Sequence, residues 1–154
     1  MRWIVASRAL LAAITIAGCG SSYTKADFIA RADAICETAF RQTHTIAPPA
    51  AGGVAAQQLT ALASYLQRVT PVVESETSGL SKLRRPAADR ALLERYLAAL
   101  RAAVAQYLEL GRAAAAGDVS GVAAAESALA AGDAQALAAR YGLRSCGAAG
   151  ATVA

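Results

Sequence analysis

The chain has 154 residues, a formal net charge of +4 and a hydrophobic content of 56%. Much of that content is alanine, which favours helices but buries little area per residue. The length suits one domain with a core of ordinary size. Because Arg2 and Arg8 belong to an N-terminal leader, the rest of the chain carries only about +2, and so weak a charge argues against nucleic-acid binding.

The first 18 residues have the layout of a secretory signal. Arg2 and Arg8 precede an almost wholly apolar run over residues 9–17, and small residues precede Cys19. The run is too short to span a bilayer, which takes about 20 apolar residues. We therefore expect residues 1–18 to direct export and to be removed.

The tetrapeptide Ile16-Ala17-Gly18-Cys19 resembles the lipobox of bacterial lipoproteins, in which the cysteine becomes the first residue of the mature chain and carries lipid. We expect acyl chains such as palmitate on Cys19 to anchor the protein to the outer face of the cell membrane, because two or three chains hold a protein durably. Residues 19–23 would then form a tether. The alternative is an ordinary signal peptide that leaves Cys19 as a free thiol.

Assigning Cys19 to lipid leaves Cys36 and Cys146 as a pair. Outside the cell membrane the environment is oxidising, so the sequence predicts a disulfide between them. The alternative is two buried thiols that remain unpaired. A Cys-x-x-Cys pattern for redox or zinc chemistry is absent from the sequence.

Apolar residues recur at helical spacing in the first half of the mature chain. The first predicted helix begins at a capping box of Thr24 and Asp27 and fades near Ile46, before a loop rich in Pro and Gly. The second runs over residues 54–83. Pro71 predicts a kink or a break within it, and Glu76 interrupts its apolar seam.

The second half of the chain predicts two further helices. One follows a turn at residues 84–87 and ends at Gly117. The other begins at the N-cap Asp118 and runs to Tyr141, with a thin apolar seam that starts at Val119. The Gly132-Asp133 pair would be able to split this last helix in two.

Four amphipathic helices with short connections predict an all-α fold, an antiparallel up-down four-helix bundle over residues 24–146. In this topology the first and last helices are neighbours, so a disulfide between Cys36 of the first helix and Cys146 after the fourth would close the bundle. Residues 147–154 are expected to be a disordered tail.

Several segments together resemble a known group of proteins. They are Tyr23 to Ile29, Ala32 to Cys36, Arg85-Pro86-Ala87, Ala116-Gly117-Asp118 and Tyr141 to Cys146. These segments are similar to those of small secreted lipoproteins of high-GC Gram-positive bacteria, and the resemblance extends over most of the mature chain. The resemblance implies an exported helical domain. That group has no established activity, so the resemblance implies no catalytic residue.

No motif in the sequence points to catalysis, and we expect a non-enzyme without a metal or a cofactor. His44 is the only histidine, and a bundle that holds two metal ions needs Glu-x-x-His pairs, which are missing. A Gly-x-Ser-x-Gly motif and a phosphate-binding glycine loop are also missing. His44 is expected to be a solvated or capping residue, and Asp33 and Glu37 to be surface charges.

Three tyrosines form the first candidate binding group. Tyr65, Tyr96 and Tyr107 could border a pocket in the bundle interior for a small apolar or aromatic ligand. The alternative is that these aromatic side chains only fill the core.

Basic residues form the second candidate group. The predicted topology returns the turn after the second helix to the lipid-bearing end of the bundle, where anionic lipids attract a basic residue by about 1 kcal/mol. The group consists of Lys82, Arg84, Arg85 and Arg90, and Lys25, Arg140 and Arg144 belong to the same end. The alternative is that they are solvated charges favoured near helix C-termini.

These observations lead to two candidate functions. The first is a membrane-tethered interaction or scaffold module of the cell envelope, whose partners are the lipid bilayer and an unidentified protein. The second is a small-ligand-binding module. A cavity inside the bundle would favour the second function, whereas close packing of alanine-rich helices would argue against it.

Overall fold

The computed structural model describes residues 23–49 and 55–146. The helices in these ranges are α1 (Lys25–His44), α2 (Ala55–Lys82), η1 (Ala87–Asp89), α3 (Arg90–Ala116), α4 (Val119–Ala130) and α5 (Ala134–Tyr141). None of them combines the length and the hydrophobicity that a membrane span requires. The expected signal peptide, Cys19, the tail and all of the tether except Tyr23 lie outside the described residues.

Helix α1 begins at the predicted capping box. The Thr24 hydroxyl accepts a hydrogen bond from the Asp27 backbone N–H at 3.2 Å, and the Asp27 carboxylate accepts one from the Thr24 N–H at 2.8 Å. These bonds satisfy two of the amide groups that a helix start leaves free. The pKa of Asp27 is lowered because its carboxylate accepts hydrogen bonds from the Thr24 hydroxyl, at 2.7 Å, and from the Thr24 N–H. The buried face of α1 carries Phe28, Ala32, Cys36 and Ala39.

Helix α2 continues through Pro71 without a break. Pro71 is exposed, so the backbone carbonyl that loses its partner lies on the solvent side and water can satisfy it. Of the two outcomes that proline allows, the structure therefore excludes the break. After the turn, the 3-10 helix η1 leads into α3, which ends at Gly117 with a left-handed φ of 71°.

The last predicted helix is two helices in the structure. Helix α4 ends at Ala130 and α5 begins at Ala134, with Gly132 and Asp133 between them. Gly142, with a φ of 98°, ends α5. Val119, which the sequence pattern assigned to the buried seam, is instead 63% exposed at the first position of α4.

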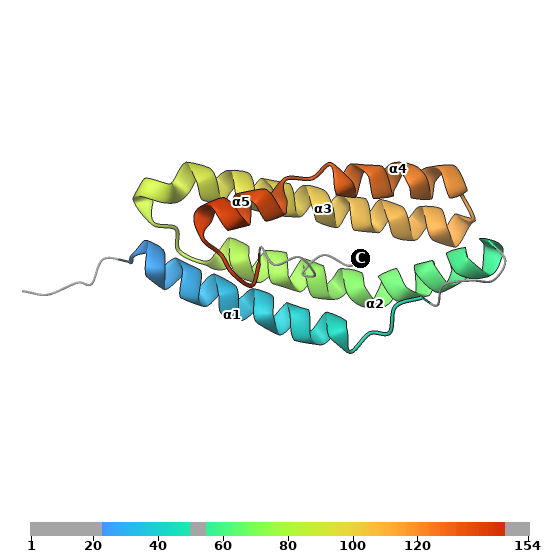
Figure 1. The fold of residues 1–154 in the computed structure, drawn as a ribbon, viewed down its shortest axis with the longest axis horizontal. Helices are drawn as coiled ribbons and strands as arrows, with labels where there is room; N and C mark the ends of the chain where they lie inside the picture. The colour runs from blue at the N-terminus through green and yellow to red at the C-terminus, as the bar shows by residue number, and fades with distance from the viewer. Residues whose placement is uncertain (1–22, 50–54, 147–154) are drawn as a thin grey trace, which may run out of the picture.

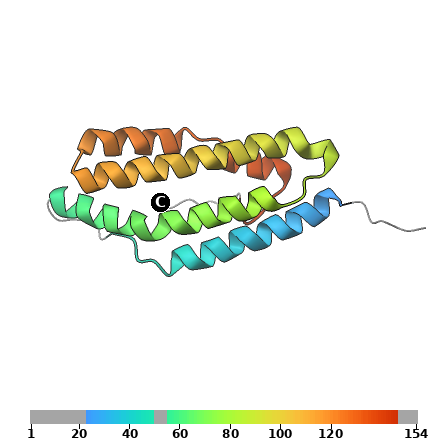
Figure 2. The same cartoon turned by 180° about the vertical axis from the view of Figure 1, so that it is seen from behind.

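The helices form an antiparallel four-helix bundle, with α4 and α5 sharing the fourth position. Helix α3 packs along α2 on one side and along α4 and α5 on the other. Helix α1 lies beside only one half of α2, the half near the turn between α2 and α3 (Figure 1). Seen from behind, α4 lies at the half of the bundle that α1 does not cover (Figure 2).

The core consequently has two parts. The first is built from α1, α2, α3 and α5, and its largest fully buried side chains are Phe28, Leu80, Leu93, Tyr96 and Tyr141. The second has only α2, α3 and α4, and it centres on Leu66, Val69, Tyr107 and Leu110. The short α1 therefore leaves one half of the bundle with three helices.

The predicted disulfide joins α1 to the segment after α5 and is confirmed. Cys36 and Cys146 are bonded across a sequence separation of 110 residues, with a Cα–Cα distance of 5.1 Å. Asp33 supports the same contact, because its carboxylate accepts hydrogen bonds from the backbone N–H groups of Arg144 and Ser145, both at 2.9 Å. The interpretation of Asp33 as a plain surface charge was therefore wrong.

Candidate functional site

A cavity of about 640 Å³ lies in the three-helix half of the bundle. Helix α2 contributes Tyr65 and Leu66 to its wall, α3 contributes Tyr107 and Leu110, and α4 contributes Leu129. The cavity extends to the junction between α4 and α5. Its volume falls within the range of about 300–1,000 Å³ that is usual for small-molecule pockets.

Small side chains explain why this space is open. Ala99, Ala102 and Ala103 of α3 face it, and Ala128 and Ala130 line it from α4. A methyl group fills far less volume than a leucine side chain, and α1 stops at His44 before it could cover this half. The alanines that favour the helices thus also leave room between them.

The cavity wall is mostly apolar, with acidic groups at one side. Its polar residues in the described chain are Gln106, Glu126, Asp133 and Gln135, and none of its described residues is a lysine or an arginine. Burial raises the pKa of the Tyr65 hydroxyl above its usual value. The site suits apolar ligands that are neutral or positively charged, and it disfavours anions.

Two of the three candidate tyrosines line this cavity, and the third does not. Tyr65 and Tyr107 are in its wall, whereas Tyr96 lies in the other part of the core with 1% of its surface exposed. The Tyr96 hydroxyl has no hydrogen-bond partner among the described residues. Burial raises the pKa of Tyr96, and the charges of Glu76 and Asp33 raise it further.

The basic residues gather where the turn after α2 meets the start of α1. The Arg84 guanidinium lies 5.8 Å from the Tyr23 ring centroid, and Lys25 lies 4.6 Å from that of Tyr141. Lys82, Arg84 and Arg90 are exposed. We call this region the basic end and define it by Lys25, Lys82, Arg84, Arg85 and Arg90.

The remaining members of the basic group differ in exposure and in position. Arg85 is half-buried and its Nη2 donates to the Ser81 carbonyl at 3.4 Å. Arg140 is exposed in the last turn of α5. Arg144, which follows α5, lies beside Asp33, a residue farther along α1 than Lys25. Asp27 and Asp89 also belong to this region and reduce its positive charge.

His44 is exposed at the end of α1, where its ring contacts the Phe40 ring edge-on at a centroid distance of 4.0 Å. No second histidine exists in the sequence to complete a metal site with it. Glu37, a neighbour on the same helix, pairs with Arg41 at 2.9 Å on the surface, as expected for residues one turn apart.

Glu76 is the functional candidate that the sequence pattern did not assign to a site. It is half-buried on α2 next to the disulfide, and burial raises its pKa to about 7. The signal in the sequence was its position inside an apolar seam, since a carboxylate is seldom buried without a reason. Its position in the sequence does not indicate which residues the Glu76 carboxylate faces in the folded protein.

Comparison with known proteins adds no assignment to this geometry. No protein-family model, no curated protein and no solved structure matches the chain.

Proposed function

We propose that the chain is an exported lipoprotein, held on the outer face of the cell membrane by lipid on Cys19, that binds a small apolar ligand in its cavity. The observation that carries this proposal is the 640 Å³ space between α2, α3 and the α4–α5 junction. A scaffold would not need such a space, so the cavity favours ligand binding over the interaction or scaffold function.

The wall of the cavity narrows the class of ligand. Leucine, alanine and tyrosine side chains supply contact area for a hydrocarbon or an aromatic ring. Glu126 and Asp133 bring negative charge to the side near the α4–α5 junction. A hydrophobic amine would satisfy both features, because its apolar body would fill the cavity and its cationic group would face the carboxylates.

Purification from native membranes in mild detergent, followed by native mass spectrometry, tests the proposal. We expect a mass above that of the lipidated polypeptide that disappears on denaturation, and small-molecule mass spectrometry would identify the released compound. The same spectra report whether Cys19 carries lipid. Isothermal titration calorimetry with a hydrophobic amine, a neutral aromatic compound and a fatty acid measures the charge preference directly.

A pair of matched variants ties binding to the cavity. Ala103→Leu adds bulk at a lining position, whereas Ala105→Leu makes the same change at an exposed position on the same helix that does not line the cavity. We expect Ala103→Leu to lower ligand occupancy about tenfold or more and Ala105→Leu to leave it unchanged. The absence of any bound or added ligand would overturn the proposal, and a protein recovered instead would favour the scaffold function.

A further inference from the structure

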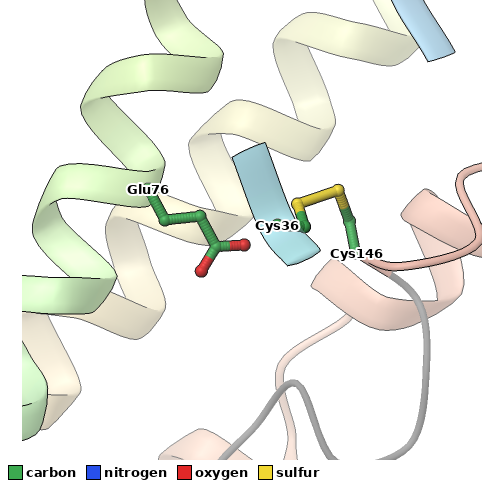
Figure 3. Close-up of side chains that lie close together, drawn as sticks. All are labelled: Cys36, Glu76 and Cys146. Carbon is green, nitrogen blue, oxygen red and sulfur yellow. A yellow bond between two sulfur atoms is a disulfide. The ribbon is translucent and has the colours of Figure 1, made fainter. Parts of the chain in front are cut away.

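A carboxylate and two sulfur atoms meet where α1, α2 and the segment after α5 come together. One ligand atom each from Cys36, Glu76 and Cys146 lies within 4.8 Å of the other two. The Glu76 side chain points from α2 toward the disulfide, which joins α1 to the C-terminal segment (Figure 3). The three residues are far apart in sequence, so only the tertiary fold makes this cluster.

The surroundings of Glu76 leave its carboxylate without a conventional partner. No hydrogen bond or ion pair reaches it from the described residues. The buried Tyr96 hydroxyl, whose pKa the charge of Glu76 raises, also has no hydrogen-bond partner in the described chain. The Glu76 carboxylate, beside the two sulfur atoms, therefore remains available to bind a ligand.

An access route to Glu76 exists from outside the bundle. A groove of about 350 Å³ between α1 and α2 is lined by Glu76 together with Ile35, Thr38, Ser75 and Gly79. The cysteine sulfurs themselves are shielded, since Cys36 is 1% exposed and Cys146 is 7% exposed. An ion or a small molecule would therefore approach along the groove from the Glu76 side.

We propose that reduction of the Cys36–Cys146 disulfide creates a site for a thiophilic divalent cation such as Zn²⁺, with the two thiolates and the Glu76 carboxylate as ligands. Zinc takes cysteine sulfur and carboxylate oxygen in tetrahedral sites, and three protein ligands leave a fourth position for water. Two sulfur ligands of one zinc ion lie about 3.8 Å apart. Once the sulfur–sulfur bond is open, the two sulfur atoms can move apart to this separation, and the Glu76 oxygen already lies within 4.8 Å of both.

The chemistry has two balanced steps. A small dithiol reduces the disulfide, so that the sulfur–sulfur bond breaks, each cysteine sulfur takes up a proton and the dithiol becomes a disulfide. The cation then forms two bonds to sulfur and one to the Glu76 oxygen, and the two thiol protons leave to solvent. The disulfide and the metal site exclude each other, and either one links α1 to the C-terminal segment.

The test uses the full chain with Cys19→Ser, so that Cys36 and Cys146 are its only cysteines. The protein is reduced with a dithiol without oxygen, freed of the reductant and titrated with Zn²⁺ by calorimetry and with Co²⁺ by absorption spectroscopy. We expect one equivalent to bind, thiolate-to-cobalt charge-transfer bands to appear and the melting temperature of the reduced chain to rise. The oxidised chain should bind neither ion at this site.

Variants of each ligand decide whether the site is the one described. Cys146→Ser should abolish the charge-transfer bands, and Glu76→Gln should weaken Zn²⁺ binding about tenfold or more. Glu74→Gln removes an exposed carboxylate two residues away and should have no effect. Circular dichroism monitors folding throughout. If the chain unfolds when it is reduced, Zn²⁺ should restore its helicity. The absence of both binding and recovery, or equal binding by Glu76→Gln, would overturn the proposal.

Discussion

Two tyrosines show how tertiary contacts decide the role of a single hydroxyl group. Tyr96 and Tyr141 are each 1% exposed. The Tyr141 hydroxyl donates to the Asp89 carboxylate at 3.2 Å, whereas the Tyr96 hydroxyl has no partner among the described residues. A buried polar group without a partner costs about 1–3 kcal/mol. The two hydroxyl groups should therefore affect stability in opposite directions.

We expect Tyr96→Phe to raise the free energy of unfolding by about 1 kcal/mol, because it removes an unsatisfied hydroxyl and keeps the ring. Tyr141→Phe is the matched control and should lower the free energy of unfolding by about 1 kcal/mol, because it removes a satisfied one. Urea denaturation followed by circular dichroism measures both values. A loss of stability in Tyr96→Phe would mean that an ordered water or another group satisfies Tyr96.

At the scale of the helices, α4 and α5 begin differently although each follows an aspartate. The Asp118 carboxylate accepts hydrogen bonds from the Gly121 backbone N–H at 3.0 Å and the Ser120 hydroxyl at 2.7 Å. These bonds lower the pKa of Asp118. Asp133 makes no side-chain hydrogen bond to the start of α5. Only α4 therefore depends on its aspartate as an N-cap.

Replacing the cap of α4 should destabilise the protein, and replacing its counterpart should not. We expect Asp118→Ala to lower the melting temperature by about 3 °C, since alanine leaves the Gly121 amide without its partner. Asp133→Ala makes the same chemical change before α5 and should leave the melting temperature within about 1 °C. Differential scanning calorimetry compares them. Equal losses would show that the Asp118 bonds do not stabilise α4.

For the whole molecule, the topology places the exposed cations Lys82, Arg84 and Arg90 at the end of the bundle where α1 begins. Arg84 lies 5.8 Å from the Tyr23 ring centroid, so the turn after α2 lies beside the start of α1. A lipid on Cys19 would keep this end close to the bilayer. Electrostatic attraction to anionic lipids would then orient the bundle.

We expect the combined change Lys82→Gln, Arg84→Gln and Arg90→Gln to weaken binding to phosphatidylglycerol vesicles about tenfold or more at low salt. The control changes Arg68, Arg101 and Arg112 to Gln, removing the same charge from exposed positions outside the basic end. All chains carry Cys19→Ser, and vesicle sedimentation gives the affinities. The same loss in both combinations would show a general charge effect without orientation.

Local sequence signals were sufficient to predict the helices and their connections. The capping box at Thr24, the glycine at 117 and the Gly132-Asp133 pair act on the backbone within a few residues, so their effects do not depend on distant neighbours. Helical periodicity then sufficed to predict the bundle, and the two cysteines left for pairing sufficed to predict its disulfide. The structure confirms both.

The candidate sites depended on distances between helices, which no local signal contains. Tyr96 and Tyr107 both follow the apolar seam of α3, yet only Tyr107 lines the cavity. The reason is that α1 covers one half of the bundle and not the other. The interruption of the α2 seam by Glu76 signalled a buried carboxylate, but only packing brought it to the disulfide.

The sequence by itself determined the class of fold, the helix boundaries to within a few residues and the cysteine pair, because backbone preference and apolar periodicity are properties of short segments. The tertiary structure alone decided where α1 stops relative to α4, and hence where space remains. It also decided which polar groups lack partners. Volume and hydrogen-bond satisfaction are properties of several elements together, and they become defined only when the helices pack.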